Sequence, residues 1–170
     1  MPYANQTQVS EARSRAEIEQ VIRKHLGREA AFSYGSMPGR AAIQFSAYGR
    51  QIRFELPLPS QTDAAEHAGR HYKGRQCRKP TVAEMSAWLE AEDRRRWRCL
   101  LLIIKGKLEA VALRIELLES ATDAERASAF EQEFLASVVV QGKDGVVRSL
   151  YEAIQGASMG GQKLLPEVQP

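Results

Sequence analysis

The chain has 170 residues, 44% of them hydrophobic and 26% charged, which is typical of one globular domain and excludes a disordered or fibrous chain. Its longest apolar run, Cys99–Ile104, is far below the roughly 20 residues of a membrane-spanning helix. Met1–Ser10 lacks the basic and apolar regions of a secretory signal, and the two cysteines cannot form a disulfide framework. We therefore expect one domain with no membrane partner, in the reducing cytoplasm.

The net charge of +3 hides an uneven distribution. Between Arg70 and Lys107 there are eleven Lys or Arg residues and four acidic residues, a net charge of +7. The other 132 residues hold 13 basic and 17 acidic residues, a net charge of −4. A basic segment of this kind attracts polyanions or acidic partners.

The first predicted element is a helix that ends at Gly27. Either Ser10 or Ser14 can cap its start, and Glu17 stands three residues after Ser14, as in a capping box. Helical spacing of apolar residues supports the prediction at Ile18, Val21, Ile22 and Leu26.

A three-stranded antiparallel meander is predicted next. Apolar and polar residues alternate in three short runs, and this alternation places one face of a sheet in the core and the other in solvent. Residues 35–39 predict the first turn, residues 48–51 a tight hairpin, and Pro57 the end of strand pairing. The face toward the core is predicted to hold Ile43, Phe45, Ile52, Phe54 and Leu56.

Residues 60–79 show no apolar periodicity and contain no acidic residue after Glu66. We interpret them as a long, mobile basic loop, since loops of this length are usually functional or disordered. Residues 156–170 are interpreted as a flexible C-terminal tail, which leaves residues 1–155 as a single α+β domain.

The dominant element is a long helix that begins after Thr81, where Thr81 and Glu84 form a capping box. If unbroken to Glu119 it has 39 residues and a length of about 58 Å. A kink near Gly106 is consistent with the cost of a helix-interior glycine, about 1 kcal/mol. An apolar stripe predicts packing on the sheet and consists of Met85, Trp88, Leu89, Leu100, Ile104, Leu108, Val111, Ile115 and Leu118.

The C-terminal part is predicted to be short and mainly helical, with a helix around Phe130 and Phe134. Val138–Val140 form either a strand or the end of that helix. The fold class is therefore α+β, with an N-terminal helix, a three-stranded antiparallel meander, a long helix packed on the sheet and a short helical C-terminal part.

The basic segment is the first candidate site, and it favours binding to DNA or RNA. Arg94, Arg95 and Arg98 lie at helical neighbour spacings and could hold a phosphate backbone, while Trp97 could stack on bases. The alternative is a solvated helix face whose arginines pair with nearby acids, with Trp97 half-buried. The candidate nucleic-acid-binding residues are Arg70, Lys73, Arg75, Arg78, Lys79, Arg94, Arg95, Trp97 and Arg98.

Metal and catalytic sites lack their usual patterns. His67, His71 and Cys77 lie in one region, but a zinc site usually needs four ligands, and the fourth is missing here. The chain has no nucleophile-elbow, phosphate-loop, dinucleotide-binding or H-E-x-x-H motif, and Glu131 and Glu133 are typical of solvated surface carboxylates. We therefore expect no metal, no cofactor and no catalysis.

The long helix also offers a homo-oligomer contact. Its apolar stripe from Leu100 to Leu118 could pair with a second chain, although it spans fewer than three heptads. Packing of the same stripe against the meander is the alternative.

Several blocks of the chain resemble a family encoded by tailed phages and prophages. They are Thr7–Ser10 leading into Ser14–Glu19, Arg53–Pro59, Arg96–Lys105 with Lys107–Val111, and Phe130–Val140 followed by Asp144-Gly145. The resemblance covers most of the chain and implies a phage-type origin in the cytoplasm of a host cell, but it assigns no activity and no site residue. A meander followed by a long helix is also similar to the core of phage single-strand annealing proteins, a likeness of fold that does not establish function.

The leading hypothesis is a small phage-type accessory protein that binds nucleic acid without catalysis through its basic loop and helix patch. The alternative is a protein-interaction module, such as a phage inhibitor of a host or defence protein. It is motivated by the absence of catalytic motifs and by a basic arm on an acidic remainder.

Overall fold

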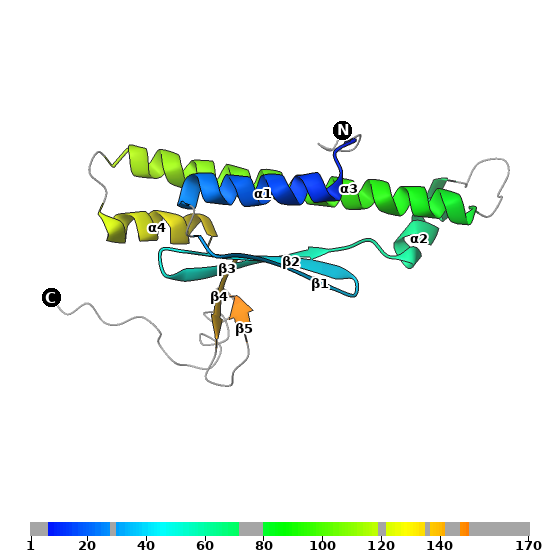
Figure 1. Ribbon diagram of the computed structural model, residues 1–170. Helices are drawn as coiled ribbons and strands as arrows, with labels where there is room; N and C mark the ends of the chain where they lie inside the picture. Colours follow the sequence, from blue (N-terminus) through cyan, green and yellow to red (C-terminus); the bar gives the residue numbers. More distant parts are fainter. Residues whose placement is uncertain are drawn as a thin grey trace.

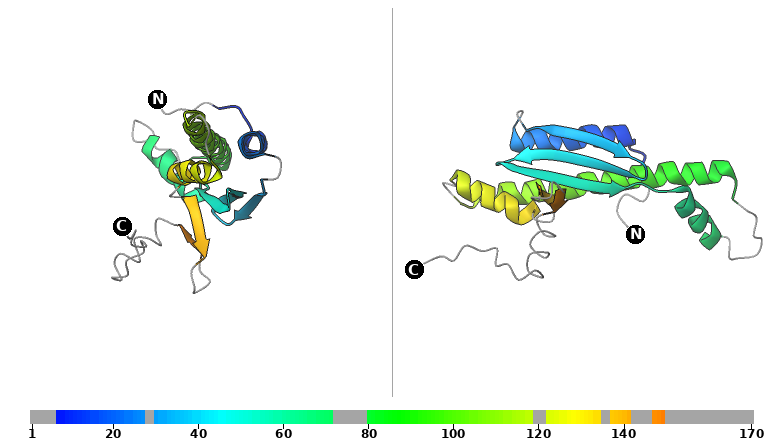
Figure 2. Two further views of the ribbon diagram at one scale, coloured as in Figure 1. Left: turned by 90° about the vertical axis from the view of Figure 1, so that its left-hand side faces the viewer. Right: turned by 90° about the horizontal axis from the view of Figure 1, so that it is seen from below.

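In the computed structural model, the residues described are 7–27, 30–71, 80–118, 122–134, 137–141 and 147–149. They form an α+β fold in which helices cover one face of a five-stranded antiparallel sheet with the order β1-β2-β3-β4-β5 (Figures 1 and 2). The predicted sequence of an N-terminal helix, an antiparallel meander, a long helix and a short C-terminal helix is confirmed. Two further strands join the meander after the last helix.

Helix α1 (Glu11–Leu26) begins at Ser10, whose Oγ accepts a hydrogen bond from the Arg13 backbone N–H at 3.3 Å. Of the two predicted caps Ser10 is therefore the correct one, and Ser14 lies fully buried one turn later. The helix ends at Gly27, which adopts φ 86° and donates its N–H to the Arg23 carbonyl at 3.1 Å. Its buried face carries Ile18 and Ile22 into the core.

The meander consists of β1 (Phe32–Met37), β2 (Arg40–Ala47) and β3 (Arg50–Pro57). Ile43 pairs with Phe54 and Phe45 with Ile52, so the predicted apolar positions share one face of the sheet. Ile43, Phe45 and Ile52 are buried, while Phe54 and Leu56 are partly buried against the same core. The predicted hairpin is a two-residue turn, in which Tyr48 and Gly49 have φ values of 50° and 72°.

The predicted loop over residues 60–79 is wrong for its first half, because Gln61–His71 form helix α2. Ser60 and Asp63 cap this helix mutually: the Ser60 N–H donates to Asp63 Oδ2 at 2.8 Å, and the Asp63 N–H donates to Ser60 Oγ at 3.2 Å. Ala64 is buried, and the His67 ring stacks on Trp88 at 4.9 Å between centroids. Because α2 contacts the rest of the fold through only a small area around Ala64 and His67, its sequence shows no apolar residues at helical spacing.

Helix α3 (Val82–Glu116) has 35 residues, and both hydrogen bonds of the predicted Thr81–Glu84 capping box are present. It runs through Gly106 as one straight element without a break (Figure 1). Most of the stripe suggested as an oligomer contact is instead buried in the core of the same chain, including Leu100, Ile104, Leu108 and Val111. The alternative of intramolecular packing is therefore correct for that stripe.

Helix α4 (Asp123–Phe134) is followed by β4 (Val138–Gln141) and β5 (Val147–Ser149). Of the two predictions for Val138–Val140, the strand is correct: β4 pairs with β3 at Val138 and Val139, and β5 pairs with β4. The predicted tail at 156–170 lies outside the described residues.

The core lies between the sheet and the helices α1, α3 and α4 (Figure 2). Seen end-on, α1 and α4 lie against two sides of α3. The core residues are Ile18, Ile22, Ala41, Ile43, Phe45, Ile52, Trp97, Leu100, Leu101, Ile104, Leu108, Val111, Phe130 and Phe134.

Candidate nucleic-acid interface

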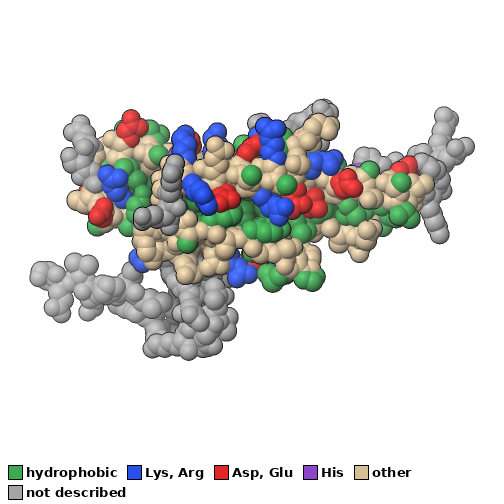
Figure 3. Space-filling view, in the orientation of Figure 1, with side chains coloured by type: hydrophobic (Ala, Val, Ile, Leu, Met, Phe, Trp, Pro, Cys, Tyr) green, Lys and Arg blue, Asp and Glu red, His purple; other side chains and the backbone are tan. Residues whose placement is uncertain are grey.

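The arginines of α3 lie among acidic side chains rather than in a continuous positive surface. Figure 3 shows Lys and Arg interspersed with Asp and Glu over the helical layer. Each of the four arginines between residues 94 and 98 has a carboxylate within 4 Å. Whether an arginine is available to bind a phosphate therefore depends on the strength of its own ion pair.

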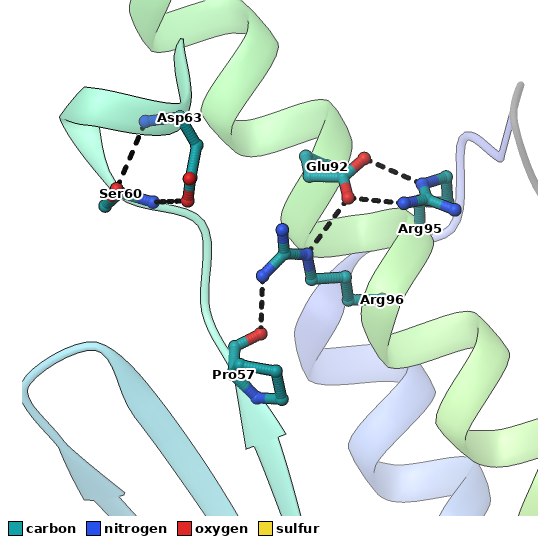
Figure 4. A network of polar contacts seen from close by, with 6 residues as sticks. All are labelled: Pro57, Ser60, Asp63, Glu92, Arg95 and Arg96. Carbon is teal, nitrogen blue, oxygen red and sulfur yellow. Dashed lines mark hydrogen bonds and ion pairs between the residues drawn. The ribbon is translucent and has the colours of Figure 1, made fainter. Parts of the chain in front are cut away.

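Arg95 is committed to Glu92. Its Nε donates to Glu92 Oε2 at 2.7 Å and its Nη2 donates to Oε1, a bidentate pair on one helical turn (Figure 4). The hydrogen bond from Arg95 is the main cause that lowers the pKa of Glu92, against the opposing effect of burial, and Arg96 lowers it further. The Glu92 side chain is only 13% exposed, so removing Arg95 would leave a largely buried carboxylate with one fewer partner.

Arg96 connects the same carboxylate to the sheet. Its Nε donates to Glu92 Oε1 at 3.0 Å, and its Nη1 donates to the Pro57 carbonyl at 2.7 Å (Figure 4). Pro57 ends β3, and Ser60 caps the start of α2 three residues later. Arg96 therefore fixes the start of the β3–α2 connection against α3.

Arg98 joins two helices, because its Nη1 donates to Glu17 of α1. That hydrogen bond is the main cause that holds the pKa of Glu17 below its usual value, and Arg13 adds to the effect. Both side chains are about one-third exposed or less. Arg98 therefore serves the packing of α1 on α3.

Arg94 is the most available of the predicted α3 arginines. Its contact with Glu90 is long, at 3.8 Å, and the Glu90 side chain is 70% exposed. The Arg94 side chain itself is 30% exposed and its Nε is buried, but so long an ion pair to a solvated carboxylate contributes little stability. A phosphate could therefore replace Glu90 as the partner of Arg94 at small cost.

The prediction that Trp97 stacks on bases is wrong, because its side chain is completely buried. The indole packs against Tyr34, with ring centroids 5.7 Å apart, and the Arg15 guanidinium lies 5.8 Å from its centroid. Base stacking needs an exposed ring face. The reason lies in the fold: Trp97 is on the face of α3 that packs against α1 and the sheet.

The remaining candidates lie in or next to residues 72–79, a range outside the described residues that contains Lys73, Arg75, Arg78 and Lys79. Arg70 is in α2. The flanking elements are well defined, since α2 ends at His71 and α3 begins after the Thr81 cap. The stack of His67 on Trp88 holds α2 beside the first turns of α3 (Figure 1). The described residues on both sides of the basic segment therefore lie at the N-terminal end of α3.

The candidate carboxylates Glu131 and Glu133 have structural partners. Glu131 pairs with Arg50, and Glu133 pairs with Arg114 at 3.1 Å. Among the described side chains, no group of three His, Cys, Asp or Glu is placed to hold a metal ion, and Cys77 lies outside that set. A hollow of about 150 Å³ on the sheet is lined by Ala31, Phe32, Ser33, Gln44, Phe45, Ser46 and Gln51, none of them titratable.

Two features escaped the sequence analysis. Asp93 has a buried Oδ1 without a hydrogen-bond partner, and its pKa is raised by burial and then by the nearby Glu11 carboxylate. The outer face of α3 exposes Ile103, Leu113 and Leu117. The sign of this exposed apolar face in the sequence was the apolar run from Cys99 to Ile104. Consecutive residues of a helix point in different directions, so the side chains of such a run cannot all face the same core.

Comparison of the chain with protein-family models, with curated proteins and with solved structures finds no match. Within the described ranges, none of the helices combines the length and the apolar character that crossing a bilayer requires.

Proposed function

We propose that this chain is a small, phage-type accessory protein that binds nucleic acid without catalysis through residues 70–79. The observation that carries the proposal is the charge of this segment. It holds five cations in ten residues, and no acidic residue occurs between Glu66 and Glu84. Charge of this density is the usual source of non-specific nucleic-acid affinity.

The basic excess is uneven even within the segment from Arg70 to Lys107. Between residues 82 and 98, α3 carries four arginines and four acidic residues, so this half of the helix is formally neutral. The net charge of +7 between Arg70 and Lys107 therefore comes from the five cations of residues 70–79 and from Lys105 and Lys107. Residues 70–79 are accordingly the part of the basic region that contains no acidic residue.

The anchoring of the segment supports the same proposal. Its ends are tied to one end of α3, through the His67–Trp88 stack on one side and the Thr81 cap on the other. Five cations are thus confined to a short stretch of chain, which raises the local potential felt by a polyanion. Arg94, with its weak ion pair, is the α3 residue best suited to add a contact.

The test is a salt titration of DNA and RNA binding, measured by fluorescence anisotropy with nuclease-treated protein. If the five cations contact phosphates, the logarithm of the affinity should fall with the logarithm of the salt concentration with a slope of about −4 to −5 for duplex DNA, and somewhat less for single strands. An affinity independent of salt, or no binding at low salt, would contradict the proposal.

A protein-interaction module is the second candidate function, and the exposed apolar face of α3 favours it. Such a module should retain a defined protein partner in a pull-down after nuclease treatment. Loss of every partner on nuclease treatment would count against it.

A further inference from the structure

The outer face of α3 carries an apolar seam that the fold leaves uncovered. We define the seam as Ile103, Gly106, Ala110, Leu113 and Leu117, which follow one another at alternating steps of three and four residues. Ile103 is 50% exposed, Leu113 58% and Leu117 75%. This spacing is that of the a and d positions in a pair of helices.

The seam lies opposite the face that packs in the core, where Ile104, Leu108 and Val111 are buried. On one flank α1 approaches, with His25 3.3 Å from Glu109. On the other flank α4 approaches, where Lys107 donates to the Glu133 carbonyl. In the end-on view of Figure 2, no described element covers the remaining side of this half of α3. A row of large apolar side chains left in solvent commonly marks a contact with another molecule.

The centre of the seam is shallow, because Gly106 and Ala110 are small. A Cβ added at Gly106 would meet nothing within 4 Å, so the space above it is open. Small residues at the centre with larger ones on either side allow a second helix to approach closely at the middle and to pack against Ile103 and Leu113 at the sides.

The charges beside the seam indicate which helix fits. The edge toward α1 is acidic, with Glu109 and Glu116, and the edge toward α4 is basic, with Lys107 and Arg114. A two-fold axis parallel to α3 sets the acidic edge of one copy against the basic edge of the other, whereas an antiparallel pair sets like charges together. The Glu109 and Arg114 side chains are 50% and 45% exposed, so each keeps a solvent-facing side beside its partners in the same chain, His25 for Glu109 and Gln132 with Glu133 for Arg114.

From these observations we infer that the seam binds the same seam of a second copy of this chain, with the two α3 helices parallel. Glu109 of each copy then faces Arg114 of the other, five positions further along. The seam covers about four helical turns, roughly 21 Å, and a contact between two single helices of this length buries less than the roughly 800 Å² per partner of a standard interface. We therefore expect self-association to be weak and to depend on concentration. The contact is confined to this half of α3, because α2 packs on the other half near Trp88.

A parallel dimer would also change how the chain binds nucleic acid. A parallel pair brings the two α3 N-termini, and with them the ends of both basic segments, to the same end of the dimer. Two linked binding segments bind a polyanion more tightly than one, because the second contact becomes intramolecular.

The experiment is sedimentation velocity of the full chain over a range of concentrations, after nuclease treatment and without added nucleic acid. The wild-type protein should shift from monomer to dimer with concentration. Ile103→Lys/Leu113→Lys places two charges in the seam and should weaken dimerisation by roughly 100-fold or more. Val82→Lys is the matched control, since Val82 is 79% exposed on the same helix but outside the seam, and it should leave dimerisation unchanged.

Charge reversal tests whether the two α3 helices of the dimer are parallel. Glu109→Arg and Arg114→Glu should each weaken the dimer, and the double variant should restore it, with circular dichroism to verify that every variant is folded. A monomer at all concentrations, a dimer insensitive to the seam lysines, or failure of the double variant to recover would overturn the inference. Because nucleic acid is absent throughout, these outcomes are independent of the proposed function.

Discussion

Arg98 of α3 donates a hydrogen bond to Glu17 of α1, although the two residues are 81 positions apart in the chain. This pair joins the first helix to the longest one at the edge of the core. An arginine that looks like a candidate phosphate ligand in the sequence therefore has a role in holding two helices together.

Replacing Glu17 by Gln should lower the free energy of unfolding by roughly 1 kcal/mol at pH 7, or the melting temperature by about 2–4 °C. The sign of the pH dependence follows from the lowered pKa of Glu17. Its stabilisation is complete above the ordinary pKa and is lost as the pH falls through the folded-state value. Thermal melts of both proteins should therefore converge in acid.

Arg13→Ala is the control for that pair. Arg13 contacts the same carboxylate at 3.2 Å, but its side chain is 73% exposed. Its removal should change stability by less than about 0.5 kcal/mol. An equal loss from both variants would show that Arg98 has no special part in joining the helices.

Trp97→Ala should destabilise the protein by about 3–5 kcal/mol, since it empties the largest fully buried site in the core. Trp97→Phe should cost less and leave nucleic-acid affinity unchanged, because the ring meets no solvent. Urea unfolding followed by circular dichroism gives the stability, and anisotropy gives the affinity. A folded Trp97→Phe variant with much weaker binding would contradict the burial of this residue.

Asp93→Asn should raise the melting temperature at pH 7. Burial raises the pKa of Asp93, so the folded protein holds its proton more tightly than the unfolded chain does. Its ionisation therefore costs stability as the pH rises above the ordinary value of 3.8. The gain from the amide should shrink toward zero near pH 3, where the carboxyl is protonated in both states. A melting temperature unchanged or lowered at pH 7 would show that Asp93 is not a desolvated charge.

Gly106→Ala should stabilise the folded monomer by about 0.5–1 kcal/mol, because alanine favours the helix and the added methyl group meets open space. Unfolding is best measured at low concentration, where dimerisation does not contribute. Gly49→Ala is the matched control. Gly49 has a φ of 72°, a left-handed conformation that is unfavourable for alanine, so this variant should be less stable than the wild type by about 1–2 kcal/mol.

The elements that could be predicted are those whose signal is local. The Thr81–Glu84 box and the alternation around Phe45 and Phe54 are each read from a few neighbouring residues, and both are confirmed. Helix α2 was missed although Ser60 and Asp63 form a local capping pattern of the same kind, because no apolar period follows it: its packing rests on Ala64 and one ring stack. A contact made by so few side chains produces no 3.6-residue period of apolar residues in the sequence.

The candidate site was harder to predict because its properties depend on partners distant in the sequence. Charge counting found the basic segment but not that Arg98 is bound by Glu17. Nor could the sequence separate the two apolar faces of α3: one stripe, with Leu100 and Leu108, is in the core, and the other, with Leu113 and Leu117, is in solvent. Which face is which depends on where α1, α4 and the sheet lie.

The most direct test of the central claim compares DNA and RNA binding by two variants of equal charge. One replaces Lys73, Arg75, Arg78 and Lys79 by Ala, and the other replaces four cations elsewhere, Arg13, Arg23, Lys24 and Arg126. Both lose four positive charges, so general attraction falls equally in both. If residues 70–79 bind nucleic acid, the affinity of the first variant at low salt should fall at least about tenfold more than that of the second. Equal losses in the two variants, or full binding by the first, would contradict it.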